Sequence, residues 1–328
     1  MHSQVIQCQN HIKLSSPISK DGLAEEILRI CQCTNAVYTN YAMVARLNDA
    51  LDRYWFLAVS SANKGGFDDS GYSTLPVETQ SLVAGTNAYK MTSFTNEVLQ
   101  ILRLSILDDD GIEYDLIHEE FDDIVDFNET YSTDSADRGK PQYWTKKGDY
   151  IYLYPCPDYS ETNGLRAYVN REMSKFVWTT FTTTFASDLI NSTTHGLTTD
   201  DGIIAETDNS DLPSGMTADT VVYYVIASGL TADVFKVSTT IGGSTITIAD
   251  DGTGNHKYTE VTKEPGIPSI HHLYLAKRAA LAFMNPKHPN FAKINAEIQQ
   301  FEQDIMDYWR TMESENKTII NTNRRAFK

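Results

Sequence analysis

Apolar residues near the end of the chain recur alternately three and four positions apart, and this spacing constrains the fold more than any other feature. It runs over seven positions: Phe291, Ile294, Ile298, Phe301, Ile305, Tyr308 and Met312. Such spacing is typical of a helix that packs lengthwise against another helix. The segment after Pro265 and Pro268 is the expected partner, because proline favours a helix start. We therefore predict helices over residues 268–315.

A second apolar stripe, with the same spacing, runs through residues 37–58 and predicts a helix with one buried face. Together with the shorter pattern before it, region 21–63 is expected to hold two helices. The Gly- and Asp-rich loop 63–76 then ends the helical pattern. Segments 21–63 and 268–315 are expected to form one helical layer.

Between these helices the periodicity changes to that of β-structure. Residues 77–176 alternate apolar and polar side chains around three turns, at Gly85-Thr86-Asn87, Asp109-Asp110-Gly111 and Gly148-Asp149. The first turn is expected to join two short strands, and the other two to close hairpins. We predict one small antiparallel sheet from this region.

Residues 177–262 differ again, because they are rich in Thr, Gly and Asp and poor in Lys and Arg. Short β-runs at 220–227, 234–240, 244–249 and 256–261 are separated by Gly-containing turns, which is typical of a compact all-β module. The predicted fold class is therefore α+β. It combines a helical bundle layer, a small antiparallel β-sheet region and an inserted all-β domain that resembles a sandwich or barrel.

The charge of the chain limits its partners. Its net charge is −17 and its pI is about 4.8. Free affinity for nucleic acid or anionic lipid is not expected, because both need clustered cations, although double-stranded DNA can pass an acidic wall without being retained. The N-terminal residues lack the pattern of a signal peptide, and no apolar run is long enough to span a membrane. We expect a protein that is made in the cytoplasm.

Searches for enzyme signatures find no nucleophile elbow, phosphate-binding loop, dinucleotide fingerprint or zinc-protease motif. The four cysteines, Cys8, Cys31, Cys33 and Cys156, lack the second ligand pair of a zinc site and are expected to be reduced and structural. His271 and His272 point about 100° apart on a helix and cannot ligate one metal as a pair. No cofactor, metal or catalytic residue is expected.

Two acidic stretches and one histidine were considered as catalytic or metal sites. The run Asp108-Asp109-Asp110 lacks the alternating ligands of a calcium loop and is interpreted as a solvated turn. Segment 118–127 carries five carboxylates without a partner that would define a role. His195, which precedes Asp200 and Asp201, is interpreted as part of a structural turn in the β-module.

Four stretches in a fixed order resemble the head-to-tail connector (adaptor) proteins of tailed bacteriophages. They are LNDALDRYWFLAVSSANKGGFDDSGYSTLPVETQSLVAGTNAY, ILRLSILDDDGIEYDL, PQYWTKKGDYIYLYPCPDYSETNGLRAYVNRE and EPGIPSIHHLYLAKRAALAF. The likeness covers residues 40–176 and 265–285. One departure stands out, because the adaptors have a short connection where this chain has about 85 residues, 177–262, that resemble a β-module inserted in many phage structural proteins.

The resemblance implies a virion structural protein without catalytic activity. Such adaptors form rings, usually of twelve copies, below the portal protein, where they extend the DNA channel and dock the tail or other neck proteins. The implied location is the virion neck, after assembly in the host cytoplasm. The resemblance also implies an adaptor core made of residues 1–176 and 263–315, with the module 177–262 inserted in it.

Two groups of residues are hypothesised to carry this function. Acidic side chains are expected to line or border the DNA channel: Asp108, Asp109, Asp110, Asp122 and Asp123. Residues 316–328 lose the helical periodicity and are expected to form an extended arm that binds the portal, through Arg324, Arg325 and Phe327.

Three other interpretations remain open. The chain could form a different neck component, such as a hexameric tail-terminator ring. It could be a receptor- or carbohydrate-binding virion protein that acts through the β-module. It could also be a hydrolase that uses His195 or the acidic clusters, which would require a strongly shifted pKa in a deep pocket.

Overall fold

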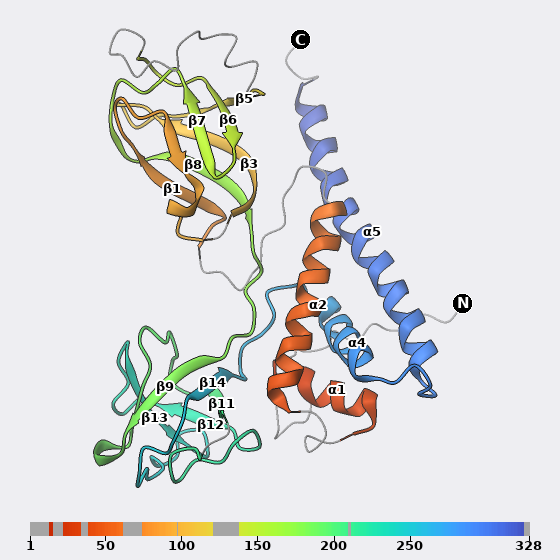
Figure 1. The fold of residues 1–328 in the computed structure, drawn as a ribbon. Coiled ribbons are helices and arrows are strands. Elements are labelled where there is room, and N and C mark those ends of the chain that lie inside the picture. Colours follow the sequence, from red (N-terminus) through yellow and green to blue (C-terminus); the bar gives the residue numbers. More distant parts are fainter. Residues whose placement is uncertain are drawn as a thin grey trace. The chain divides into compact units, whose positions relative to one another are not determined.

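The computed structural model describes residues 13–15, 22–33, 39–61, 74–96, 98–120, 138–208 and 211–324. The chain forms two compact units, one from Met1–Ala58 and Ser174–Trp309 and the other from Val59–Met173 and Arg310–Lys328. The first holds the helical layer and a β-barrel, and the second holds a pair of β-sheets (Figure 1). The predicted α+β fold class is confirmed. The assignment of an adaptor core and an inserted module stays a prediction.

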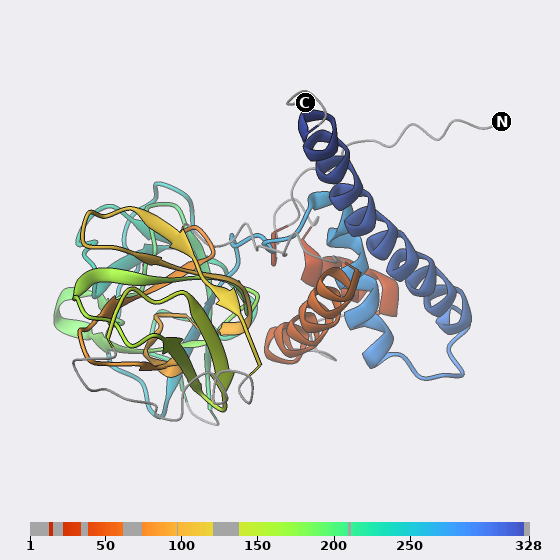
Figure 2. The ribbon, with the colours of Figure 1, turned by 90° about the horizontal axis from the view of Figure 1, so that it is seen from above.

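Four α-helices form the described helical layer: α1 (Leu23–Cys31), α2 (Asn40–Ser61), α4 (His272–Phe283) and α5 (Phe291–Arg324). A short 3₁₀ turn, η3 (Ser269–His271), leads into α4. Figures 1 and 2 show α2, α4 and α5 side by side. Most described residues of the predicted stripes are buried, including Leu47, Leu51 and Tyr54 of α2 and Ile298 and Ile305 of α5, whereas Tyr41 of α2 is 50% exposed. Packing of these stripes accounts for the layer.

Helix α5 runs further than its apolar seam. It continues to Arg324, so the prediction of an extended arm over 316–328 is wrong for the part of that segment that the structure describes. The physical reason lies in the composition, because no Gly or Pro occurs after Phe291. Once a helix is formed, each further residue adds a backbone hydrogen bond even where no apolar face continues.

The second unit contains two four-stranded sheets rather than the single sheet that the sequence predicts. One has the order β1-β8-β3-β4 and the other β2-β7-β6-β5. Their bounds are β1 Val77–Leu82, β2 Ala88–Lys90, β3 Val98–Leu107, β4 Glu113–Asp115, β5 Ile117–His118, β6 Tyr143–Lys147, β7 Tyr150–Tyr154 and β8 Glu161–Arg171; the 3₁₀ turn η1 (Met91–Ser93) follows β2. Buried apolar side chains of both sheets form one shared core.

The pairing of these strands confirms two predicted hairpins and corrects two other expectations. The β3–β4 and β6–β7 hairpins form around the predicted turns. Strands β1 and β2, however, belong to different sheets, because β1 pairs with β8 and β2 pairs with β7. The β5–β6 pair is parallel. Alternation of apolar and polar residues along a strand defines its buried face but does not determine which strand it pairs with. The sequence therefore does not predict these long-range pairings.

Residues 179–260 form a closed six-stranded barrel in the order β10-β13-β12-β11-β14-β9. Its strands are β9 Thr179–Thr184, β10 Leu189–Asn191, β11 Gly202–Thr207, β12 Tyr223–Ile226, β13 Val234–Ser238 and β14 His256–Glu260, with the 3₁₀ turn η2 (Phe185–Ser187) after β9. The predicted strand at 244–249 is absent. That segment instead contacts the barrel through Ile246 N–H, which donates to the Val237 carbonyl, and Ile248 N–H, which donates to the Asp188 carboxylate.

One asparagine of α2 holds the segment that leads into the barrel. The Asn48 side chain donates to the Phe176 carbonyl at 2.8 Å and accepts from the Phe176 N–H at 3.0 Å. Both backbone groups of Phe176 are therefore satisfied by one amide, as a neighbouring strand would do. Next to it, Lys175 pairs with Asp52 of α2 at 3.1 Å.

We expect Asn48→Ala to lower the free energy of unfolding of this region by about 2 kcal/mol, because it removes the hydrogen bonds to both the N–H and the carbonyl of Phe176. Asn48→Asp is the matched control, since a carboxylate can still accept from the N–H but cannot donate to the carbonyl. Hydrogen exchange of the Phe176 amide measures both effects. Equal protection in Asn48→Ala and the parent protein would show that Asn48 does not hold the Phe176 backbone.

Candidate functional site

The acidic turn between β3 and β4 places its three carboxylates in different environments. Asp108 is buried, and its carboxylate accepts the N–H groups of Asp110 and Ile112 and pairs with Lys140 at 3.2 Å. Burial alone would raise the pKa of Asp108, but the bonds from Ile112 and Lys140 outweigh it and lower this pKa. Asp109 and Asp110 are exposed, whereas Asp122 and Asp123 lie outside the described residues. Within this group, the exposed charge is thus on Asp109 and Asp110.

The residues hypothesised to bind the portal lie at the end of the described chain. Arg324 is the last residue of α5, and the structure describes its backbone but not its side chain. Arg325 and Phe327 lie outside the described residues. The three residues therefore remain a proposal without described side-chain contacts.

His195 lies in a turn at the barrel, as the sequence predicts. Its Nδ1 accepts the Leu197 N–H at 3.0 Å, and its ring packs edge-on against Phe235, with 4.9 Å between centroids. Its Nε2 is buried without a hydrogen-bond partner among the described residues. The nearby Asp201 carboxylate is used by the N–H and hydroxyl of Thr198. The turn therefore lacks the carboxylate–imidazole–nucleophile chain that hydrolysis would need.

His271 is a buried histidine with a lowered pKa. It is buried between α2 and α5, where its Nδ1 lies 2.8 Å from the Tyr54 hydroxyl and its ring packs edge-on against Tyr308. Burial, reinforced by the neighbouring His272, lowers the pKa of His271 to about 4. The Trp309 indole N–H also donates to the Tyr54 hydroxyl, at 3.2 Å. This shifted histidine belongs to a packed core, and the sequence pattern anticipated packing but not the hydrogen-bonded chain.

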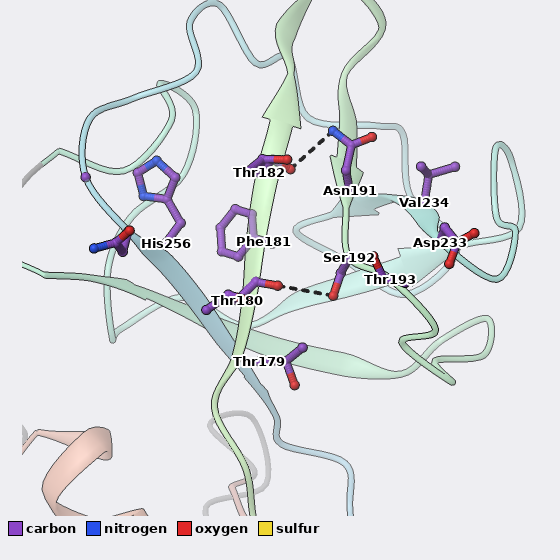
Figure 3. Close-up of a pocket in the computed structure, with 12 residues that line it drawn as sticks. Thr179, Thr180, Phe181, Thr182, Asn191, Ser192, Thr193, Asp233, Val234 and His256 are labelled. Atoms are coloured by element: carbon purple, nitrogen blue, oxygen red, sulfur yellow. Dashed lines mark hydrogen bonds between the residues drawn. The ribbon is translucent and has the colours of Figure 1, made fainter.

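A recess of about 660 Å³ lies on the barrel (Figure 3). Its lining consists mainly of hydroxyl and amide side chains, from Thr179, Thr180, Thr182, Asn191, Ser192, Thr193 and Asn255, with Asp233 and His256 at its edge. Several of these groups already bond within the barrel, as Asn191 and Ser192 do to β9. Both ring nitrogens of His256 are engaged, by Thr207 and by the Asp251 carbonyl. The lining suits a neutral polar ligand and lacks an activated nucleophile.

The outer side of the sheet β2-β7-β6-β5 carries several tyrosines, and we call this surface the tyrosine face. It consists of Tyr143, Tyr150, Tyr152 and Tyr154, together with the neighbouring Ile117. The pairings Tyr143↔Tyr154 and Ile117↔Tyr143 place them together, while Trp144, Ile151 and Leu153 turn into the core. Tyr150 is 40% exposed and Ile117 is 55% exposed. Tyrosine combines an apolar ring with a polar tip and is enriched at protein interfaces.

Neither a metal centre nor a membrane span is found in the part of the chain that the structure describes. No three His, Cys, Asp or Glu side chains there converge as a ligand set. No helix within the same residues has the length and hydropathy to cross a bilayer. The described surfaces that could serve assembly are thus the acidic turn, the tyrosine face and the barrel recess.

Comparison with protein families decides the class of this protein. The family model described as SU10 adaptor protein matches residues 22–325, which is nearly the whole chain. The chain belongs to the SU10 adaptor protein family. It is therefore a structural adaptor protein of a bacteriophage virion, from a family that is not an enzyme family. A search of curated proteins finds no match.

The family assignment also bears on partners and on the barrel. An adaptor associates with the portal and tail components of a phage, which implies a location in the virion neck. The matched range includes the barrel residues 179–260. The status of the barrel as an insertion stays a prediction.

Proposed function

We propose that this SU10-family adaptor forms a closed ring of about twelve copies between portal and tail, and that it extends the channel through which the genome leaves the head. The observation that carries the proposal is the family match over residues 22–325. A ring repeats one heterologous contact until it closes, so each copy needs two complementary flanks. We assign the ring wall to the long helices α2 and α5, and the tyrosine face is the proposed apolar, hydrogen-bonding surface for a neighbour.

The experiment is electron microscopy and native mass spectrometry of the full chain, alone and mixed with portal protein from the same phage. The expected result is a closed ring of about twelve copies on the portal. A hexamer would favour a tail-terminator ring instead. A chain that stays monomeric in the presence of portal would contradict both. Portal is included so that assembly on the portal is detected even if the free chain is monomeric.

The acidic surface is proposed to ease the passage of DNA. The chain has a net charge of −17, and like charge on a channel wall prevents retention of a polyanion. Because Asp108 is used internally, we assign this role to the exposed Asp109 and Asp110, with Asp122 and Asp123 as further candidates.

Neutralising the exposed pair, as Asp109→Asn with Asp110→Asn, is expected to slow genome ejection in a reconstituted virion. The effect should be strongest at low salt, where phosphate interactions are least screened. DNA-release kinetics measure it. Asp200→Asn with Asp201→Asn, in the barrel turn, is the matched control for loss of two charges. Unchanged DNA release in the Asp109 and Asp110 variant would show that these residues do not border the channel.

The end of α5 is proposed to bind the portal, with Arg324 and Arg325 pairing with carboxylates and Phe327 filling an apolar pocket. Truncation after Asn316 is expected to abolish docking of the adaptor onto portal-bearing heads, while the core helices stay folded because the apolar seam in the sequence ends at Met312. Co-sedimentation with heads measures docking. Arg324→Ala with Arg325→Ala tests the charges without shortening the helix. Full docking by the truncated chain would show that the segment is dispensable.

A second function is favoured by the barrel recess. Its hydroxyl- and amide-rich lining matches the hydrogen-bonding needs of a sugar, so the barrel is also proposed to bind a host glycan. Glycan-array binding by the full chain tests this proposal. Asn191→Leu removes one polar group of the recess and is expected to weaken glycan binding. Binding that is absent, or unchanged in the variant, would contradict it.

A further inference from the structure

A loop of the barrel binds the first residue of α2. The Asp219 carboxylate accepts the Asn40 N–H, with both oxygens 3.2 Å from the nitrogen. In return, the Asn40 side-chain amide donates to the Asp219 carbonyl at 2.8 Å. Asp219 adopts a left-handed backbone, with φ of 58°, and its own N–H donates to the Ala205 carbonyl of β11. The loop thereby joins β11 to the N-terminus of α2, where a negative charge is favourable.

The helix does not need this loop for its own cap. Thr39 already accepts the Ala42 N–H with its hydroxyl and the Met43 N–H with its carbonyl. Local side chains of this type are sufficient to start a helix. The bonds between Asp219 and Asn40 therefore act mainly as an attachment of the barrel to α2, and we call this pair the latch.

A second carboxylate lies beside the latch and opposes it. Glu206 follows Ala205 on β11, and its Oε2 is buried without a hydrogen-bond partner among the described residues. Burial raises the pKa of Glu206, the charge of Asp219 raises it further, and Lys257, its cross-strand neighbour on β14, acts against them. Burial likewise raises the pKa of Asp219, against the bonds from Asn40. An unsatisfied buried carboxylate beside another carboxylate requires an explanation, because burial of such a charge is costly.

We propose that Asp219 and Asn40 form a releasable latch between the barrel and α2, and that Glu206 keeps it weak by repelling the Asp219 carboxylate. Asp219 faces Glu206 on β11 and the positive N-terminus of α2, and Lys257 on β14 faces Glu206. The latch allows the barrel to detach from α2 while its strands stay closed. This device is independent of the proposed ring.

The pH dependence follows from the direction of the shifts. Glu206 repels Asp219 only while its carboxylate is charged, and burial together with the charge of Asp219 raises the pKa of Glu206 above its ordinary value. The latch is therefore strengthened as pH falls toward protonation of Glu206, and it weakens as pH rises to neutrality. A latch made only of an ordinary ion pair or cap would respond in the opposite direction.

Hydrogen exchange of the full chain, read at residues 39–46 and 216–221, tests the proposal. Glu206→Gln should slow exchange of both segments about tenfold at neutral pH, since it removes the repulsion between two neighbouring carboxylates. Asn40→Ala should speed exchange by a similar factor, with Thr39 still capping α2 and β11–β14 still protected. In the Asn40→Ala background, Glu206→Gln should lose its effect.

Glu260→Gln is the matched control, because Glu260 is another partly buried barrel carboxylate whose pKa burial raises, and its acidic neighbour is Asp201 rather than Asp219. It should leave exchange at 39–46 unchanged. Unchanged or faster exchange in Glu206→Gln would overturn the proposal. Loss of protection throughout β11–β14 in Asn40→Ala would also overturn it, because the contact would then be part of the barrel fold and not a latch.

Discussion

Tyr54→Phe is expected to lower the free energy of unfolding of the helical layer by about 3 kcal/mol, although it removes a single oxygen atom. Tyr54 is fully buried in α2, and its hydroxyl joins two other helices. The Trp309 N–H donates to this oxygen at 3.2 Å, which leaves the hydroxyl proton to donate to Nδ1 of a neutral His271 at 2.8 Å. The variant takes the hydroxyl from the buried His271 ring and from the partly buried Trp309 indole at once, and a buried polar group that loses a partner costs about 1–3 kcal/mol.

Tyr274→Phe is the matched control. Tyr274 is equally buried, and its hydroxyl bonds to Glu302 at 3.2 Å, but that carboxylate also accepts from Arg53. The carboxylate keeps charged donors after the change, so a loss of only about 1 kcal/mol is expected. Native-state hydrogen exchange of α2 and α4 measures both variants, because it reports the helical layer separately from the β-units. Equal losses in the two variants would contradict the hydrogen-bonded chain through Tyr54.

Acidification is expected to destabilise the helical layer through His271. The unfolded histidine has its ordinary pKa of 6.5, whereas burial lowers the pKa in the folded chain to about 4. Between these two values the unfolded state binds a proton that the folded state does not. The stability contribution of His271 is therefore fully present above pH 6.5 and is lost as the pH falls toward 4, by an amount on the order of 3 kcal/mol.

His271→Asn tests this expectation, because the asparagine oxygen can replace Nδ1 as an acceptor for Tyr54 but does not titrate. The difference in stability between the parent chain and this variant should decrease steadily from pH 6.5 to pH 4. His288→Asn, in the turn between α4 and α5, is the matched control for loss of a histidine outside the core. A pH-independent difference between the parent chain and His271→Asn would show that His271 is not held neutral in the folded state.

The candidate sites were only partly accessible from the sequence. The interpretation of His195 as a turn residue follows from its neighbours in the sequence, and it agrees with the hydrogen bond from the Leu197 N–H and the ring contact with Phe235. The ion pair between Asp108 and Lys140 could not be predicted from the sequence, because the two residues lie 32 positions apart. The latch between Asn40 and Asp219 and the role of Tyr54 involve still longer separations.

By itself, the sequence determined the elements whose cause is local. Periodic burial defined α2 and the seam of α5, Gly-containing turns defined the β3–β4 and β6–β7 hairpins, and composition marked the barrel region. Only the tertiary structure decided which strands pair across two sheets, that the barrel closes, and which buried hydroxyl joins three helices. The physical reason is that periodicity records which face of an element is buried, whereas the partner of that face depends on the simultaneous packing of segments far apart in the chain.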